Sequence, residues 1–507
     1  MRTNGHNGSV NVFNSTSPMI LLPDGTPHVL KPGAGNGVAE AQISAKPEAL
    51  EFREFPDGTL VDLVRNSRDP KKAEFLIWKN GQSRIEKTYH YGGKEFVPRP
   101  LDPSLLKAVR LPEGIEPCGG AEQLLDAMGQ CLSVCVDLED KQLRLVCKFV
   151  LYTWFQDRFP VAPYLWLIGP YGAGKTTLLR LLQCLCRRGI TVSDLTAASL
   201  YSLPASIKPT LLIDEFESRP NARDRDLLRL LRSGSTRGGH VVRGARIYES
   251  FCAKIVASRQ SSRDAALASR AVFISLRPTR KTLPALDDTT LEVIAGKFQS
   301  KLVDYRLQNY AKVSTNFGCD VPDFTPRMKD VARALAAPLL GNSELVRDLF
   351  SGLSAQDEDA KLNRYGEPEW VVAAALFADC HKETGELTMG NLAFSVGRAL
   401  AENCETYRLS PRAVGEILRS LGLATQKLGN QGRGLRLTQN VIRQIHQIVR
   451  DLGLKRSDIL PWIAVDAGHG GPPCALCQEF GLMVRDDGKT LRCLPLLMPR
   501  KSGSLYS

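Results

Sequence analysis

The run from Gly169 to Thr176 constrains this chain more than any other segment. It reads Gly-Pro-Tyr-Gly-Ala-Gly-Lys-Thr and matches G-x-x-x-x-G-K-[ST], the pattern of a phosphate-binding loop. The apolar run 164–168 precedes it and the amphipathic pattern 178–182 follows it, so the sequence predicts a strand, a glycine-rich loop and a helix in that order. A chance glycine-rich turn is the alternative, and the flanking segments disfavour it.

Each part of this loop has a physical role in binding a polyphosphate. Glycines without a Cβ let the backbone turn tightly and direct several N–H groups at one anion. The N-terminus of the following helix adds a partial positive charge. Lys175 can reach the β- and γ-phosphates, and the Thr176 hydroxyl can ligate Mg²⁺. The predicted nucleotide-binding residues of the loop are Gly169, Pro170, Tyr171, Gly172, Ala173, Gly174, Lys175, Thr176 and Thr177.

A second apolar run, 211–213, ends in Asp214 and Glu215. Such a strand is the expected partner of the loop, with Asp214 in the Mg²⁺ shell and Glu215 as general base for an attacking water. Its alternative is an ordinary acidic loop start. Five β-like runs joined by helical segments predict an α/β fold with a doubly wound, mainly parallel sheet, whose ligands bind at the carboxyl ends of the strands.

The rest of the chain divides by composition and periodicity. The expected order is a flexible tail (1–48), a small strand-rich module (49–118), a helical linker packing on the core (119–159), the core itself (160–280), a helical lid (281–385), a winged-helix domain (386–453) and a cysteine-containing tail (454–507).

Charge and cysteine content limit the possible partners and cellular location of the chain. The chain holds 66 Lys and Arg against 54 Asp and Glu, a net charge of +12, which allows a polyanionic partner without demanding one. We find no apolar run long enough for a membrane span and no signal peptide at Met1, and the 13 cysteines follow no disulfide framework. We therefore expect reduced cysteines, no membrane partner and a cytoplasmic location.

The loop and the Asp-Glu strand resemble those of P-loop ATPases of the AAA+ and superfamily-three helicase kind, and the chain is similar to helicase-like proteins of phages, plasmids and integrated elements, over about residues 160–340. The resemblance implies an ASCE-type sheet, ATP as nucleotide and assembly into a ring such as a hexamer. It further implies a polar sensor at Ser258, an arginine at Arg270 reaching a neighbour's site (with Arg263 as competitor), and a second sensor arginine at Arg327.

Two basic segments suggest nucleic-acid contact. The resemblance places the interval 237–246 in a central pore, where Arg237, Arg243 and Arg246 would touch phosphates; a solvated basic loop is equally consistent. Helices at 392–402 and 411–421 followed by a hairpin around 429–432 resemble a winged helix-turn-helix. Residues 401–450 hold eight Lys or Arg against three Glu, a net of +5. The expected DNA contacts are Arg412, Arg419, Lys427, Arg433 and Arg436; protein contact or simple solvation are the alternatives.

The C-terminal cysteines offer a weaker signal. Cys474-x-x-Cys477, Cys493 and His469 are a full set of four donors for a structural Zn²⁺, but no second pair has the usual spacing, so reduced packing cysteines are the alternative.

Taken together, the sequence predicts an ATP-hydrolysing motor acting on DNA, helicase-like or associated with replication. One alternative is an ATP-switched winged-helix regulator or defence sensor with slow turnover. Another is a protein-remodelling ATPase, whose hydrolysis rate DNA would leave unchanged.

Overall fold

A computed structural model describes residues 19–21, 27–29, 47–452, 475–479, 483–486 and 490–493. Within the range 47–452 the described residues exclude 67, 70, 194–195, 197, 217–221, 244, 261, 263, 315–319, 365–366, 382–384 and 403–407.

The centre of the fold is a five-stranded parallel sheet. Its strands are β10 (Tyr164–Ile168), β11 (Gly189–Val192), β12 (Thr210–Ile213), β15 (Lys254–Ser258) and β16 (Ala271–Ser275), in the order β11-β12-β15-β10-β16. Most of their residues are buried, because helices cover both faces of a parallel sheet. The predicted α/β fold with a parallel sheet is confirmed.

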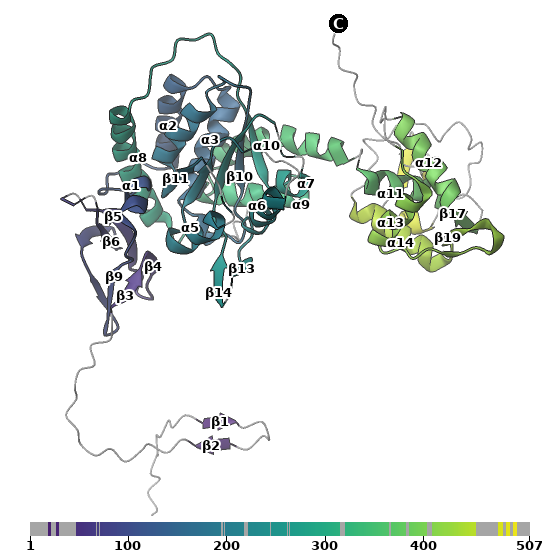
Figure 1. The fold of residues 1–507 in the computed structure, drawn as a ribbon, viewed down its shortest axis with the longest axis horizontal. Helices are drawn as coiled ribbons and strands as arrows, with labels where there is room; N and C mark the ends of the chain where they lie inside the picture. Colours follow the sequence, from purple (N-terminus) through teal and green to yellow (C-terminus); the bar gives the residue numbers. More distant parts are fainter. Residues whose placement is uncertain are drawn as a thin grey trace, which may run out of the picture. The chain divides into compact units, whose positions relative to one another are not determined.

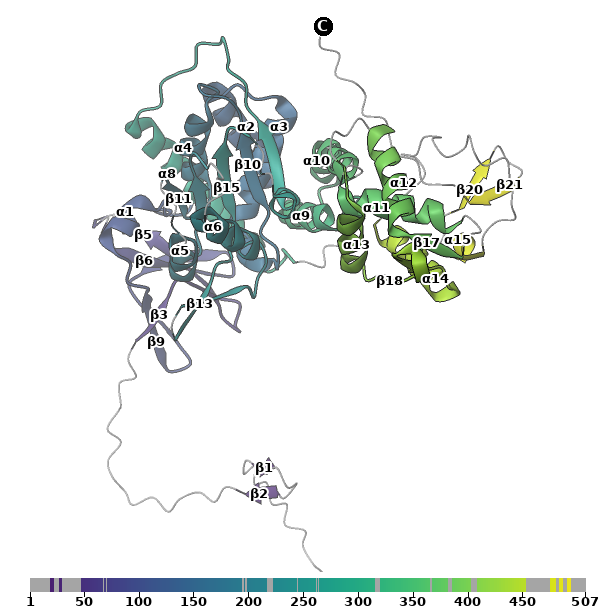
Figure 2. The same ribbon diagram turned by 45° about the vertical axis from the view of Figure 1, so that its right-hand side comes forward.

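The alternation of side chains along β10 separates the two faces. Leu165 and Leu167 join a core cluster with α2 (Ala121–Cys135), α3 (Asp140–Thr153), α4 (Lys175–Leu185) and α8 (Asp288–Asn309). Tyr164 and Trp166 pack on the other face with α5 (Ser199–Ile207), α6 (Ala222–Ser233) and α7 (Ala265–Ala268). The sheet is therefore the middle of three layers, as Figures 1 and 2 show.

The helices after the sheet pack into the same core. Apolar residues of α8, α9 (Pro326–Ala336), the short helix η2 (Ala337–Leu339) and α10 (Ser343–Arg364) share a cluster with α2, α3 and α4. A second short helix, η1 (Gln156–Arg158), follows α3 in sequence. These helices lie in the region predicted as a lid. Although α8 and α10 have 22 residues each, every helix of the described ranges is too short or too polar to traverse a bilayer.

The segment before the core is built from strands. An antiparallel sheet runs in the order β4 (Phe52–Glu54), β5 (Leu60–Arg65), β6 (Ala73–Lys79), β7 (Gln82–Glu86). Asn80 and Gly81 join β6 to β7 with φ of 49° and 81°, as a two-residue type I′ turn requires. The other elements are β1 (Met19–Leu21), β2 (Pro27–Val29), β3 (Glu48–Leu50), β8 (Tyr89–Tyr91), β9 (Lys94–Pro98) and α1 (Pro103–Ala108).

A buried ionic cluster joins β5 to the core. Asp62 lies 2.9 Å from Arg187, 2.7 Å from Arg188 and 3.3 Å from Arg306. Arg306, on α8, also forms two hydrogen bonds of 2.8 and 2.6 Å with Asp157 of η1. Burial alone would raise the pKa of Asp62, but the three arginines lower that pKa to about 2. Asp62 is therefore ionised in the folded protein at neutral pH.

The C-terminal domain has its own core around α11 (Pro368–Cys380). Its strands β17 (Glu386–Thr388), β18 (Gln426–Lys427) and β19 (Arg433–Arg436) form an antiparallel sheet in the order β17-β19-β18. Its helices are α12 (Met389–Glu402), α13 (Pro411–Ser420), η3 (Gly429–Gln431), α14 (Gln439–Asp451) and α15 (Ala475–Glu479). The predicted order of helix, helix and hairpin is present, with β17 as a third strand. A separate ribbon is formed by β20 (Met483–Asp486) and β21 (Thr490–Cys493).

We expect Asp62→Asn to lower the free energy of unfolding by about 3–5 kcal/mol, because it leaves buried arginines uncompensated. The control is Asp57→Asn. The hydrogen bond from Lys79 lowers the pKa of Asp57 to about 2 as well, but Asp57 is exposed, so its loss should change stability little. Urea unfolding followed by tryptophan fluorescence measures both.

The sign of the pH dependence follows from the lowered pKa of Asp62. Its contribution is full above the unfolded value of about 4 and is lost as pH falls through about 2. The stability difference between wild type and Asp62→Asn should therefore shrink between these values. A difference that grows on acidification would contradict this role.

Candidate active site

The glycine-rich loop follows β10 at the carboxyl edge of the sheet. A Cβ on Gly169 would lie 2.6 Å from the Leu276 carbonyl oxygen, so only glycine fits beside β16. Gly172 and Gly174 have φ of 72° and 84°, in the left-handed region that favours glycine. Gly174 is also the N-cap of α4, so the loop leads directly into the helix N-terminus. This is the strand, loop and helix context that an anion site requires.

The loop and the acidic strand meet at one hydrogen bond. Thr176 Oγ1 donates to Asp214 Oδ2 at 3.1 Å, which brings the first turn of α4 to the end of β12. Lys175 Nζ donates to the carbonyl oxygens of Gly169 and Pro170 at 2.7 and 2.8 Å. The ammonium group is thus held at the loop itself. The structure brings Lys175, Thr176 and Asp214 together as the sequence motifs require.

Glu215 lies directly after Asp214 on an unusual backbone. Its φ is 54°, and its N–H donates to Asp214 Oδ1 at 3.0 Å. The next residue, Phe216, returns to the sheet: its N–H donates to the Ala257 carbonyl at 2.9 Å and its ring packs against Trp166. Glu215 is therefore an exposed residue on a kink, fixed on both sides by strand contacts.

Ser258 ends β15, the strand between β10 and β12. Its hydroxyl donates to the Gln260 carbonyl at 2.5 Å and accepts from Trp166 Nε1 at 2.7 Å. Only 5% of Ser258 is exposed. The residue lies at the same edge as the loop, and its hydroxyl is engaged in fixing the end of the strand.

Arg259, which the sequence motifs do not single out, lies at the loop. Its guanidinium carbon is 3.7 Å from the ring centroid of Tyr171, the third residue of the loop. Tyr171 is 67% exposed, so this stacked pair lies at the surface beside the loop glycines. The signal in the sequence is its position one residue beyond the carboxyl end of β15.

Arg270 and Arg327 lie away from the loop of their own chain. The Arg270 carbonyl accepts from Tyr164 N–H at 3.0 Å, at the opposite end of β10 from Gly169. Its guanidinium donates to the Ala266 carbonyl. Burial and then the charge of Arg327 lower the pKa of Arg270, so Arg327 lies near Arg270. Arg327 lies in the first turn of α9, which packs against α3 and α10. Arg263, the competitor of Arg270, lies outside the described residues.

The basic segment 237–246 is largely a hairpin. Strands β13 (His240–Arg243) and β14 (Arg246–Glu249) pair with Arg243 opposite Arg246, and they project from the core (Figure 1). Arg237 is separate from this pair, since it donates to the Asp157 carbonyl at 2.7 Å and stacks on Phe251. The interval expected to be a loop is therefore mostly a paired hairpin, and Val241, Val242 and Ile247 in it are residues that favour strands.

The basic residues of the C-terminal domain are exposed, and several have partners. Arg412 lies 3.3 Å from Glu416, and Arg436 lies 3.0 Å from Glu386. Arg433 donates to the Thr425 carbonyl at 2.7 Å. Arg419 on α13 and Lys427 on β18 are exposed. The structure places these cations on α13 and on the sheet, as the sequence indicates.

Two of the four predicted zinc ligands fall outside the described residues. His469 and Cys474 lie there, and Cys493 is described only as the last residue of β21. Cys477 faces His381 and His446, which sequence reasoning missed. These histidines are far apart in sequence and follow no ligand spacing.

Comparisons with known proteins give only distant likeness. No family model matches the chain, and no curated protein matches it. A solved apo structure of the NrS-1 C-terminal region is 14% identical, covering 75% of this chain and 96% of that chain, with a TM-score of 0.34. The structure of an active helicase, SCCmec type IV Cch, is 13% identical, covering 79% and 80%, with a TM-score of 0.39. At these TM-scores the likeness is too distant to carry a conclusion.

We expect Gly169→Ala to lower the free energy of unfolding by about 1–3 kcal/mol, because its Cβ would overlap a backbone oxygen. The matched control is Gly129→Ala in α2, where a Cβ would meet nothing within 4 Å. That change should stabilise the helix by about 0.5–1 kcal/mol. Equal effects at the two positions, measured by chemical unfolding, would contradict the close packing of the loop against β16.

Proposed function

We propose that this chain is a P-loop enzyme that hydrolyses ATP and acts on DNA. The observation that carries the proposal is the contact of 3.1 Å between Thr176 Oγ1 and Asp214 Oδ2. It joins a glycine-rich loop, a helix N-terminus and an acidic strand end at one place. Two motifs far apart in the sequence therefore meet at one edge of the sheet, where ligands of such folds bind.

The same contact supports a Mg²⁺ site. A hydroxyl and a carboxylate are the hard oxygen donors that Mg²⁺ prefers, and Thr176 and Asp214 are the residues that would hold it. The bound ion would neutralise charge on the phosphate oxygens. In this proposal the side chains of Thr176 and Asp214 have no other role than holding the ion and its water shell.

The chain's own groups divide the remaining tasks. Backbone N–H groups of the loop and the α4 N-terminus bind phosphate oxygens. Lys175 Nζ exchanges its bonds to the Gly169 and Pro170 carbonyls for phosphate contacts and stabilises the charge that develops during transfer. Glu215, exposed at the strand end, takes a proton from the attacking water. Arg259, stacked on Tyr171, supplies a further cation beside the phosphates.

The position of Arg270 supports assembly into a ring. It lies at the opposite end of β10 from its own loop, so it would contribute to hydrolysis only in a neighbouring subunit, as the family resemblance implies. Arg327, close to Arg270, would lie at the same subunit boundary. Ser258 in this proposal positions the end of β15 between the loop strand and the acidic strand.

Two basic elements support DNA as the partner. The β13–β14 hairpin carries Arg243 and Arg246 on opposite strands, suited to phosphates in a pore. In the C-terminal domain the order α12, α13 and β18–β19 supports a winged helix, with cations on α13 and on the wing. Coupling of hydrolysis to movement of the hairpin would make the enzyme a helicase-like motor.

The test is ATP hydrolysis by the full chain with and without single- and double-stranded DNA. Lys175→Ala should abolish nucleotide binding, since it removes the phosphate-binding cation. Glu215→Gln should retain binding and lower kcat by about 10²–10⁴-fold. The matched control is Glu86→Gln, an exposed acid on β7 far from the loop in sequence, which should hydrolyse ATP as wild type does.

Each outcome of this test separates the function classes. Stimulation by DNA of any sequence supports the motor. Slow hydrolysis with binding to one DNA sequence indicates a switch, and a rate that DNA leaves unchanged indicates action on proteins. Normal hydrolysis by Glu215→Gln would show that Glu215 is not the base.

The double variant Arg419→Ala/Lys427→Ala should weaken DNA binding and reduce the slope of log affinity against log salt by about 2, at roughly 0.9 per lost phosphate contact on duplex DNA. Arg450→Ala is the control, since it removes an equally exposed cation from α14 outside the predicted contacts. Fluorescence anisotropy at several salt concentrations measures the slope. An unchanged slope in the double variant would exclude these two cations from the interface.

A further inference from the structure

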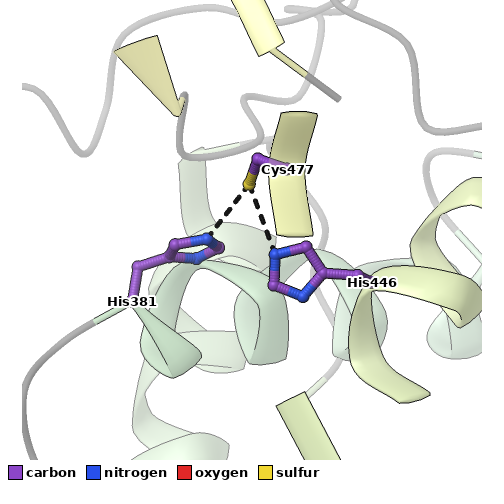
Figure 3. A group of neighbouring side chains, drawn as sticks. All are labelled: His381, His446 and Cys477. Carbon is purple, nitrogen blue, oxygen red and sulfur yellow. Dashed lines mark hydrogen bonds between the residues drawn. The ribbon is translucent and has the colours of Figure 1, made fainter. Parts of the chain in front are cut away.

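Three donor atoms converge inside the C-terminal domain (Figure 3). His381 follows α11, His446 lies in α14 and Cys477 lies in α15. Cys477 Sγ is 3.3 Å from His381 Nε2 and 3.3 Å from His446 Nε2, and the three atoms all lie within 4.8 Å of one another. His446 and Cys477 are each 0% exposed. Three elements distant in sequence therefore direct nitrogen and sulfur atoms at one buried point.

Backbone carbonyls set the orientation of both imidazoles. His381 Nδ1 lies 2.7 Å from the Phe377 carbonyl oxygen, and His446 Nδ1 lies 2.7 Å from the Ile442 carbonyl oxygen. A carbonyl oxygen only accepts, so each Nδ1 carries the hydrogen. In a neutral imidazole the Nε2 atom then presents a lone pair, and both lone pairs meet the sulfur. Histidines that ligate metals typically donate the N–H of their other ring nitrogen to a carbonyl or carboxylate in this way.

The protons of these three groups favour a cation between them. A thiol has one hydrogen and can donate to one Nε2. The other Nε2 would then face a sulfur lone pair, which is repulsive in a buried site. The protein can relieve the conflict by transferring a proton, which leaves an imidazolium and a thiolate. A cation at the centre relieves it completely, because all three atoms become ligands.

We propose that His381 Nε2, His446 Nε2 and Cys477 Sγ bind one Zn²⁺ ion. Two imidazoles and a thiolate are ligands that zinc favours. Tetrahedral zinc, with bonds of about 2.0–2.1 Å to nitrogen and about 2.3 Å to sulfur, separates these donors by about 3.5 Å. The two sulfur-to-nitrogen distances of 3.3 Å are close to this spacing, and the two nitrogens lie within 4.8 Å of each other. The fourth position is completed by water or another donor; Cys474 lies outside the described residues and is not assigned.

The ion fastens α15 to α11 and α14. An independent ion pair acts at the same place: Arg443 of α14 makes two contacts of 2.8 Å with Glu479 of α15. The ring of Phe377 packs against both histidines, with centroids 4.5 and 5.1 Å away. The short helix α15 buries little apolar surface of its own apart from Cys477. Metal ligation thus supplies much of the attachment of this segment. This site is independent of the nucleotide site.

The test uses the full chain purified without chelators. Elemental analysis should find about one zinc per chain. Cys477→Ser and His446→Asn should each lose most of it. The matched control is Cys380→Ser: its sulfur lies 3.4 Å from His381 Nδ1, on the other side of the same ring, so the variant should keep its zinc. Circular dichroism establishes that each variant is folded.

Cobalt exchange and proteolysis give readouts that do not depend on enzymatic activity. Co²⁺-substituted wild type should show a thiolate-to-cobalt absorption band that Cys477→Ser lacks. A chelator should increase the sensitivity of α15 to protease in wild type and leave the sensitivity of Cys477→Ser unchanged. A folded wild-type chain that contains no zinc and gives no cobalt band would overturn the proposal and indicate an imidazolium–thiolate pair. Equal loss of zinc in Cys380→Ser and Cys477→Ser would overturn the ligand assignment.

Discussion

Asp62 brings a negative charge from β5 into contact with three guanidinium groups, and this contact fixes how α4 meets the rest of the core. Arg187 and Arg188 lie between the end of α4 and the start of β11, while Arg306 belongs to α8. The glycine-rich loop leads into the N-terminus of α4. One end of this helix is thus held by buried ion pairs, and the other begins at the loop. A rigid helix between the two is what positions Thr176 against Asp214.

The buried cluster contains equal numbers of negative and positive groups. Glu51, Asp62 and Asp157 face Arg187, Arg188 and Arg306, so three negative and three positive groups leave water together. Burial and then repulsion from the other two arginines lower the pKa of Arg187 to about 10, which still leaves it charged at neutral pH. Such a cluster specifies one arrangement of the partners, because any displacement exposes an unpaired charge to a low dielectric.

The sequence predicts the strands and the loop because each depends on residues that are close together in the chain. Apolar runs of four or five residues become buried parallel strands, and glycines at fixed offsets permit the left-handed conformations of Gly172 and Gly174 in the loop. The ionic cluster around Asp62 is not predictable in this way, since its members come from five segments and each looks like an ordinary surface charge in sequence. The same holds for His381 and His446, which only the packing of α11 against α14 brings together. The position of Arg327 depends on how α9 docks, and no periodicity encodes that.

Glu215 has a strained backbone conformation that a glycine would adopt without cost. A residue with a Cβ held at φ of 54° costs on the order of 1–3 kcal/mol that a glycine would avoid. Selection for folding alone would favour glycine at this kink, and glycine has no carboxylate. The contacts that Asp214 and Phe216 make with neighbouring strands offset the backbone strain of this glutamate. Glu215→Gly would therefore relieve the backbone strain and at the same time remove the carboxylate from the end of this strand.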